Sequence, residues 1–166
     1  AYDHIIHDAA IQHLPVVFCM DRSGIAGEDG PTHHGALDIA YLKCIQGMIV
    51  TAPKDGNELR HLLYTALDYS DGPFSIRYPK ASSESFDEKG QAELLPIGSW
   101  EVCRKSDGNT VILVVGTQVF DGIRAAENLS QKGIACEVVN CRFIKPMDIG
   151  YLQSISDRFD QVIIID

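Results

Sequence analysis

Val111-Ile112-Leu113-Val114-Val115-Gly116-Thr117 is the stretch of sequence that decides the fold. Its apolar residues predict a strand covered on both faces, as in a parallel sheet, and Gly116-Thr117 opens a helix. The residues expected on the inward face of that helix are Phe120, Ile123, Ala126 and Leu129. Gly133 ends the helix, and residues 135–140 predict the next strand. A strand, a helix and a strand joined by short connections indicate an α/β fold with a parallel sheet.

The same alternation extends through the first half of the chain. Residues 16–20 are apolar throughout and predict a strand covered on both faces, and residues 48–52 predict a second buried strand. Asp55 caps a helix whose inward face carries Leu59, Leu62, Leu63, Ala66 and Leu67. Other elements expected from the sequence are helices over residues 2–10, 34–42 and after Asp148, and strands over residues 74–78, 100–103 (an edge strand) and 161–165. Both halves are therefore expected to contain a parallel sheet.

A polar stretch divides the chain into two units. Residues 81–91, which open the stretch 81–97, are the most polar part of the sequence, and such a segment cannot bury enough apolar surface to offset the entropy lost on ordering. We therefore expect a linker there, with one unit over residues 1–80 and another over residues 98–166. Each unit is small for an autonomous domain.

Composition excludes several classes of function. The chain has 166 residues, 14 of them basic and 23 acidic, and a formal charge of −9, which argues against a nucleic-acid surface with clustered Lys and Arg. No apolar run approaches the roughly 20 residues that span a bilayer, so no membrane span is expected. The five cysteines form no CxxC pair, and their spacing fits no zinc site. We therefore predict reduced cysteines, no metal site within the chain and a cytoplasmic location.

The residues that can carry chemistry gather in the loop 21–35. This loop follows a predicted strand, at the end where ligands bind to parallel sheets, and long loops inside a compact α/β unit are usually functional. Arg22 can bind a phosphate or a carboxylate through two parallel hydrogen bonds. His33 offers an imidazole, the type of side chain that suits proton transfer, and Asp29 can accept a hydrogen bond from a substrate hydroxyl or orient an imidazole. Composition leaves open a polar loop with an internal Arg–Asp pair, and it does not separate His33 from His34.

Larger motifs narrow the interpretation. Four stretches stand out: AYDHIIHD (1–8), LPVVFCMDRSGIAGEDGPTHHG (14–35), DGPFSIRYPK (71–80) and RFIKPMD (142–148). Together they resemble the 1-deoxy-D-xylulose-5-phosphate synthases, which belong to the transketolase-like thiamine-diphosphate enzyme family. The DGPTH core at residues 29–33 is shared with transketolase itself, whereas the DRSG lead-in at residues 21–24, together with AYDHIIHD, resembles the synthases more narrowly. No GxGxxG or P-loop motif indicates another nucleotide site.

The resemblance implies a fold and a reaction. Residues 1–80 are then the later part of a domain that binds the pyrimidine of thiamine diphosphate. Residues 98–166 are the first part of a transketolase C-terminal domain. The chain is therefore expected to be an internal fragment of a longer enzyme, inactive alone. These transferases condense pyruvate with D-glyceraldehyde 3-phosphate and release CO2, in non-mevalonate isoprenoid biosynthesis and in thiamine and pyridoxal biosynthesis.

The resemblance also implies cofactors and an oligomeric state. The synthases use thiamine diphosphate and Mg²⁺, which the family holds through a GDG…N motif that this sequence lacks. The cofactor-binding residues are therefore expected mainly upstream of Ala1. A homodimer is the usual state of the family.

Residue roles follow from the matching motif positions. Arg22 is expected to bind the phosphate of the aldehyde substrate. Lys80 stands where the family has a second phosphate-binding Arg after Tyr-Pro, so it keeps the charge but loses the planar fork of a guanidinium. Asp29 and His33 are expected to contact substrate hydroxyls and reaction intermediates, with His33 as the proton carrier. Arg77 is expected to serve structure.

Two other interpretations stay open at this point. The first is another thiamine-diphosphate enzyme, such as transketolase or the β subunit of a 2-oxo-acid dehydrogenase, with the same fold and different donors. The second is a non-catalytic α/β assembly module that supplies only a dimer interface. The consequences of replacing Arg22 and His33 distinguish these interpretations.

Overall fold

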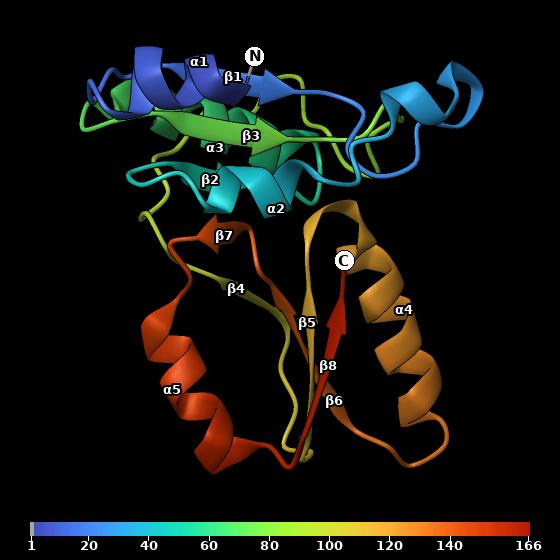
Figure 1. The fold of residues 1–166 in the computed structure, drawn as a ribbon. Coiled ribbons are helices and arrows are strands. Elements are labelled where there is room, and N and C mark those ends of the chain that lie inside the picture. The colour runs from blue at the N-terminus through green and yellow to red at the C-terminus, as the bar shows by residue number, and fades with distance from the viewer. Residues whose placement is uncertain (1) are drawn as a thin grey trace.

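Two four-stranded sheets form the framework of the structure, a computed structural model that describes residues 2–166 (Figure 1). The first sheet has the order β1-β3-β2-β7 and the second the order β4-β6-β5-β8. The strands are β1 (Val17–Met20), β2 (Ile49–Thr51), β3 (Phe74–Arg77), β4 (Glu101–Arg104), β5 (Thr110–Val114), β6 (Cys136–Asn140), β7 (Phe143–Lys145) and β8 (Gln161–Ile165). Three strands of each sheet are parallel, and β7 and β4 pair antiparallel at one edge. The predicted α/β fold with parallel sheets is confirmed.

Helices cover both faces of each sheet. They are α1 (Tyr2–His4), which continues as a π-helix over Ile5–Ala10, α2 (Asp38–Lys43), α3 (Gly56–Asp68), α4 (Val119–Ser130) and α5 (Ile149–Arg158). On the first sheet, α3 packs on one face and the N-terminal helical segment and α2 on the other. On the second sheet, α4 and α5 lie on opposite faces (Figure 1). Within residues 2–166, no helix has the length and apolar character needed to cross a bilayer.

The strand that decides the fold is buried along its whole length. Every residue of β5 is buried, and α4 packs closely on it because Gly122 has no side chain. A Cβ at Gly122 would lie 2.8 Å from Cγ2 of Val114. Val119 takes the first inward position of the helix, and the prediction that Phe120 holds it is wrong. A 3-10 turn over Gly116–Gln118 precedes α4 and shifts its start.

The prediction that Asp55 caps α3 is confirmed, but the predicted inward face of this helix included two leucines that are exposed. Asp55 accepts a hydrogen bond from the backbone N–H of Glu58 at 2.8 Å. Leu62 is fully buried, whereas Leu63 and Leu67 are 38% and 71% exposed. These two leucines lie at the flank of the helix, where the sheet below does not reach them.

Strand β1 differs from its prediction. It lies at an edge of the first sheet; Val17 packs against the cluster on one face and Phe18 and Met20 against that on the other, but none of its residues is fully buried and Cys19 is exposed. The five cysteines are all free, with Cys136 and Cys141 buried and Cys44 exposed. Edge position, which depends on strand order, explains why an apolar run alone overestimated burial here.

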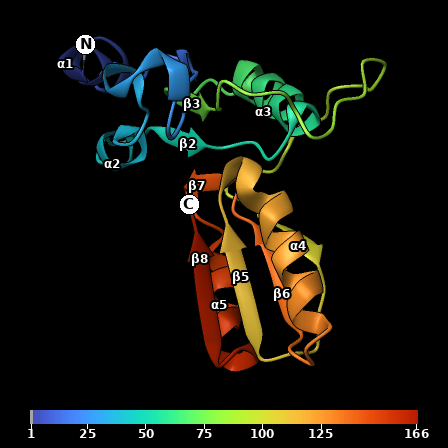
Figure 2. The same cartoon turned by 90° about the vertical axis from the view of Figure 1, so that its right-hand side faces the viewer.

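Residues 81–97 contain no helix or strand and follow the surface of α3 (Figure 2). Hydrogen bonds hold them there: the Gly56 N–H donates to Oγ of Ser83 at 2.7 Å, and the Leu95 N–H donates to Oγ1 of Thr65 at 2.9 Å. The segment expected to be a linker is therefore held against α3 by polar contacts, and its Leu95 also packs against the apolar cluster under that helix.

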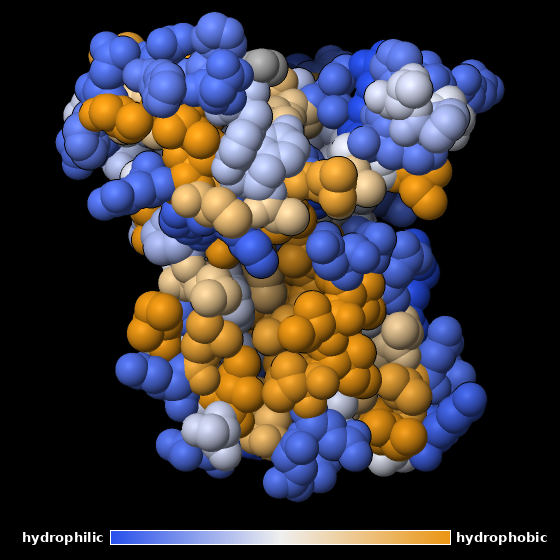
Figure 3. All heavy atoms as spheres, viewed as in Figure 1, coloured by the Kyte–Doolittle hydropathy of each residue, from blue (hydrophilic) through white to orange (hydrophobic). Residues whose placement is uncertain are grey.

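The second sheet presents apolar side chains at its β8 edge. The exposed residues there are Val162, Ile163 and Ile164. Figure 3 shows apolar surface over the second sheet on the side seen in Figure 1. Since β8 pairs with β5 on one side only, this edge is the less covered part of that sheet.

Candidate functional site

The loop 21–35 is closed at its base by backbone contacts. Gly35 donates its N–H to the carbonyl oxygen of Arg22 at 3.0 Å, and Gly24 donates to the carbonyl of Gly35 at 3.1 Å. A Cβ on Gly35 would lie 2.5 Å from that Arg22 oxygen, so only glycine allows this approach. Arg22 itself has a positive φ of 61°. The loop therefore leaves β1 in a strained turn that aims the Arg22 side chain.

Three of the four predicted site residues meet at one carboxylate. Nε of Arg22 donates to Oδ2 of Asp29 at 2.7 Å. Nζ of Lys80, which comes from the segment after β3, lies 2.9 Å from Oδ1 and 3.1 Å from Oδ2 of the same carboxylate. Arg22 also pairs with Asp21. We call Arg22, Asp29 and Lys80 the loop cluster.

The charges of the loop cluster stabilise one another. The hydrogen bond from Lys80, followed by that from Arg22, holds the pKa of Asp29 below its usual range. The hydrogen bond to Asp29 in turn raises the pKa of Arg22. Asp29 is therefore an ionised acceptor. The two cations beside it, Arg22 and Lys80, can also donate hydrogen bonds to an anionic group of a ligand, in place of Asp29 or together with it.

The structure separates the two neighbouring histidines. His34 is half-buried, and its Nδ1 accepts the backbone N–H of Ala26 at 3.0 Å, which ties the two sides of the loop together. His33 is exposed, and its Nδ1 lies 3.1 Å from Oγ1 of Thr32. His33 makes no contact with the loop cluster among the interactions of residues 2–166. Of the pair, His33 is the one free to reach a ligand.

A cavity of about 340 Å³ lies next to the loop, at the carboxyl ends of strands from both sheets. Its walls include Ser23–Ile25 of the loop, Ala52 and Pro53 after β2, and Gly116–Gln118 after β5. The loop cluster and His33 do not line it. The predicted site residues therefore belong to the loop and the segment after β3 beside this cavity, and do not form its walls.

Sequence reasoning missed a buried ion pair in the cavity wall. Nε of Arg77 donates to Oδ2 of Asp38 at 2.7 Å, and both residues are buried. The contact fits the structural role expected for Arg77. A charged residue at the end of the apolar strand Phe74-Ser75-Ile76 is the signal that could have found it, because a buried charge needs a partner.

The described residues offer no metal centre. Within residues 2–166, no group of three or more His, Cys, Asp or Glu side chains is placed to hold a metal ion.

Comparison with known proteins identifies relatives for the whole chain. Residues 1–84 match the model of the transketolase pyrimidine-binding domain, and residues 98–166 match that of the transketolase C-terminal domain. The chain is 47% identical to 1-deoxy-D-xylulose-5-phosphate synthase of Aquifex aeolicus (strain VF5) over 166 residues, which is 100% of this chain and 26% of the relative. It is 49% identical to the synthase of Thermomicrobium roseum over 148 residues, 89% of this chain and 23% of the relative.

Solved structures show the same fold. A split gene transketolase, described as an inactive beta4 tetramer, gives a TM-score of 0.85 at 23% identity and covers 99% of this chain and 52% of its own. Transketolase from Campylobacter jejuni gives a TM-score of 0.75 at 20% identity, over 95% of this chain and 28% of its own. The resemblance to the synthases is confirmed by the relatives, and the chain spans about a quarter of their length.

Proposed function

The chain belongs to the transketolase family, and from that premise we propose that it is the substrate-binding part of a 1-deoxy-D-xylulose-5-phosphate synthase. The identity of 44–49% to proteins of that name favours this activity over transketolase or a 2-oxo-acid dehydrogenase β subunit. The complete enzyme would condense pyruvate with D-glyceraldehyde 3-phosphate and release CO2, a step of non-mevalonate isoprenoid biosynthesis.

One observation carries the proposed substrate role: Arg22 and Lys80 converge on Asp29 from separate parts of the chain. Two cations at one point suit the phosphate of the aldehyde substrate, since charge-assisted hydrogen bonds are the strong ones. Arg22 offers a planar fork and Lys80 a compact point charge. The phosphate would take the hydrogen bonds that Asp29 now accepts.

Asp29 and His33 would then act on the rest of the substrate. Asp29, whose oxygens the phosphate would release from Lys80 and Arg22, would accept hydrogen bonds from substrate hydroxyls. His33, exposed at the end of the loop, would carry protons at the reacting oxygen, as a positioned imidazole can near neutral pH. The loop places both residues beyond the carboxyl end of β1, which is where ligands of parallel sheets bind.

The cofactors would be held by other parts of the enzyme. Thiamine diphosphate supplies the electron sink for decarboxylation of a 2-oxo acid. Within residues 2–166, no group of three or more His, Cys, Asp or Glu side chains is placed to hold a metal ion, and the sequence lacks a GDG…N motif. The proposal therefore assigns the diphosphate and Mg²⁺ to residues outside this chain.

The proposal also covers the domain boundaries, the cellular location and the oligomeric state. The family matches over residues 1–84 and 98–166 support a pyrimidine-binding part over residues 1–80 and a C-terminal part over residues 98–166, joined by residues 81–97. The free cysteines support a reducing, cytoplasmic setting. A homodimer is proposed because it is the usual state of the family.

Kinetics of a complete synthase that contains this chain, loaded with thiamine diphosphate and Mg²⁺, test the substrate role. Arg22→Ala should raise the KM for D-glyceraldehyde 3-phosphate about 10- to 100-fold, the effect of losing a hydrogen bond between charged groups, and change the KM for pyruvate less. Arg124→Ala is the matched control, because Arg124 is an exposed arginine on α4 paired with Asp121. Unchanged KM in Arg22→Ala would refute the phosphate role.

A further inference from the structure

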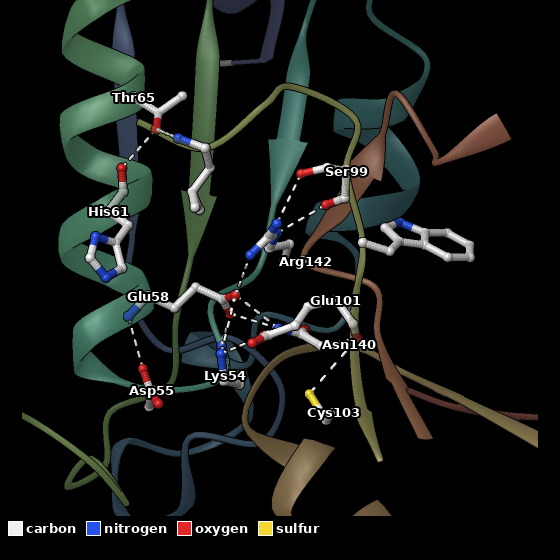
Figure 4. Close-up of polar contacts among 12 residues, drawn as sticks. Lys54, Asp55, Glu58, His61, Thr65, Ser99, Glu101, Cys103, Asn140 and Arg142 are labelled. Carbon is white, nitrogen blue, oxygen red and sulfur yellow. Dashed lines mark hydrogen bonds and ion pairs between the residues drawn. The ribbon is translucent and has the colours of Figure 1, made fainter. Parts of the chain in front are cut away.

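A buried carboxylate connects the layers around the two sheets. Glu58 lies in the first turn of α3 and is only 2% exposed. Its two carboxylate oxygens accept hydrogen bonds from Nδ2 of Asn140, on β6, at 2.8 and 3.0 Å. One of them also accepts the backbone N–H of Lys54 at 2.7 Å. Figure 4 shows these donors pointing toward the Glu58 carboxylate.

Two cations complete the surroundings of Glu58. Nζ of Lys54 and Nη1 of Arg142 each lie 3.5 Å from Oε1. Lys54 also pairs with Glu101 of β4 at 2.7 Å. The Arg142 guanidinium donates to the carbonyl oxygen and to Oγ of Ser99 at 3.0 and 2.9 Å (Figure 4). Groups from the segments before and after residues 81–97 therefore share one buried charge.

One polar atom of Asn140 is buried without a hydrogen bond. Asn140 is fully buried, and its Oδ1 has no hydrogen-bond partner. Turning the amide over would satisfy nothing, because it would place Oδ1 against the Glu58 carboxylate. The side-chain amide of Asn140 therefore serves as a hydrogen-bond donor to Glu58. Loss of such donors to a buried carboxylate strongly destabilises the folded chain.

The backbone just before β7 makes a second connection at the same place. The Ala52 N–H donates to the carbonyl oxygen of Arg142 at 3.0 Å, just before β7 joins the first sheet beside β2. Arg142 thus contacts Ala52 through its backbone while its side chain reaches Glu58. Ala52 and Pro53 form part of the cavity wall, so the position of Arg142 bears directly on the shape of the cavity.

We propose that Glu58 is a positioning residue that anchors residues 98–166 against residues 2–80 and so sets the shape of the cavity between the two sheets. If residues 98–166 move away from residues 2–80, the Glu58 carboxylate, which belongs to residues 2–80, loses its contacts with Asn140 and Arg142. We call Glu58, Lys54, Asn140 and Arg142 the Glu58 lock. The proposal concerns the architecture and holds for whatever ligand the loop binds.

The single tryptophan reports on this contact. Trp100 packs against apolar clusters of both sheets. Its Nε1 donates to the carbonyl oxygen of Phe143 at 2.8 Å. Fluorescence of Trp100 therefore responds when the two parts separate, whereas far-ultraviolet circular dichroism responds when helices and strands unfold.

Matched variants of the chain test the proposal. Glu58→Gln keeps the size and an acceptor but removes the charge that faces Lys54 and Arg142. Amide hydrogen exchange at Ala52 and Lys54 should accelerate about 10- to 100-fold, while the amides of β5 stay unchanged, and the Trp100 transition should precede the dichroism transition. Glu101→Gln, at a carboxylate that is 41% exposed and pairs with the same lysine, should accelerate this exchange less than about fivefold.

Two results would overturn the proposal. Equal effects of Glu58→Gln and Glu101→Gln would show that the buried charge has no special role. A uniform rise in exchange that includes β5 would show a general loss of stability. If Glu58→Gln does not fold, exchange of the unaltered chain in low denaturant decides: the amides of Ala52 and Lys54 should exchange through one shared, denaturant-dependent opening. Exchange through separate, denaturant-independent fluctuations would contradict the lock.

Discussion

The buried pair of Arg77 and Asp38 allows a quantitative prediction. Arg77 is 9% exposed and Asp38 is 5% exposed, and their charged atoms lie 2.7 Å apart. Arg77→Met removes the cation and leaves the Asp38 carboxylate uncompensated in the cavity wall. Removing one partner of a buried ion pair costs about 3–5 kcal/mol, so the free energy of unfolding should fall by about that amount.

A double variant separates lost charge compensation from lost packing. Asp38 also accepts the Ile39 N–H at the start of α2 at 3.0 Å, and Asp38→Asn keeps an oxygen for that bond. Because the double variant Arg77→Met with Asp38→Asn leaves no unpaired buried charge, and Asp166, which lies 3.7 Å from Nη1 of Arg77, is 56% exposed, it should recover a large part of the lost stability. Arg124→Met, at an exposed pair, should cost less than about 1 kcal/mol.

Urea unfolding of the chain, followed by circular dichroism, measures all of these free energies. The slope with denaturant should stay the same in each variant, so that a change in midpoint is a change in stability. A double variant as unstable as the sum of its single variants would refute the reasoning, because it would mean that the two charges do not depend on each other.

Two further predictions concern the α4 packing and the loop. Gly122→Ala should destabilise the chain by about 1–3 kcal/mol, despite the better helix propensity of alanine, because the added Cβ lies 2.8 Å from Cγ2 of Val114. Urea unfolding measures this loss of stability, and adding Val114→Ala to the same chain should relieve the steric clash. The pKa of Asp29 is lowered by the hydrogen bond from Lys80, followed by that from Arg22. The contribution of this carboxylate to stability is therefore present above the ordinary aspartate range and is lost as the pH falls through the lowered value. Lys80→Met should move the Asp29 pKa upward in a carbon-13 NMR titration, and an unmoved pKa would contradict the contact.

The elements that local sequence predicted correctly have local causes. The run Val111–Val115 and the caps Asp55 and Asp148 depend on neighbours within a few residues, and β5 and both caps appear in the structure. Strand β7 was not predicted, because Phe143–Lys145 has only three residues and its pairing with β2 is a long-range contact. Edge position also depends on strand order, which explains the overestimated burial of β1.

The loop was found by its composition, but its contacts required the structure. The internal pair of Arg22 and Asp29, which composition left open, is present. The convergence of Lys80 on the same carboxylate joins residues far apart in the chain. The Glu58 lock was missed for the same reason. Asn140 and Arg142 are distant from Glu58 in the sequence, and no pattern around them indicates that they face a buried carboxylate. The roles of Arg22, Asp29, His33 and Lys80 toward substrate stay predictions.

The phosphate preference of a complete synthase that contains this chain tests the central claim most directly. The measurement is the ratio of kcat/KM for D-glyceraldehyde 3-phosphate to kcat/KM for D-glyceraldehyde, in the unaltered enzyme and in Arg22→Ala. If the loop cluster binds the phosphate, the substitution should lower this ratio about 10- to 100-fold, because only the phosphorylated aldehyde loses a contact. A ratio that stays the same, with both aldehydes affected equally, would contradict the account.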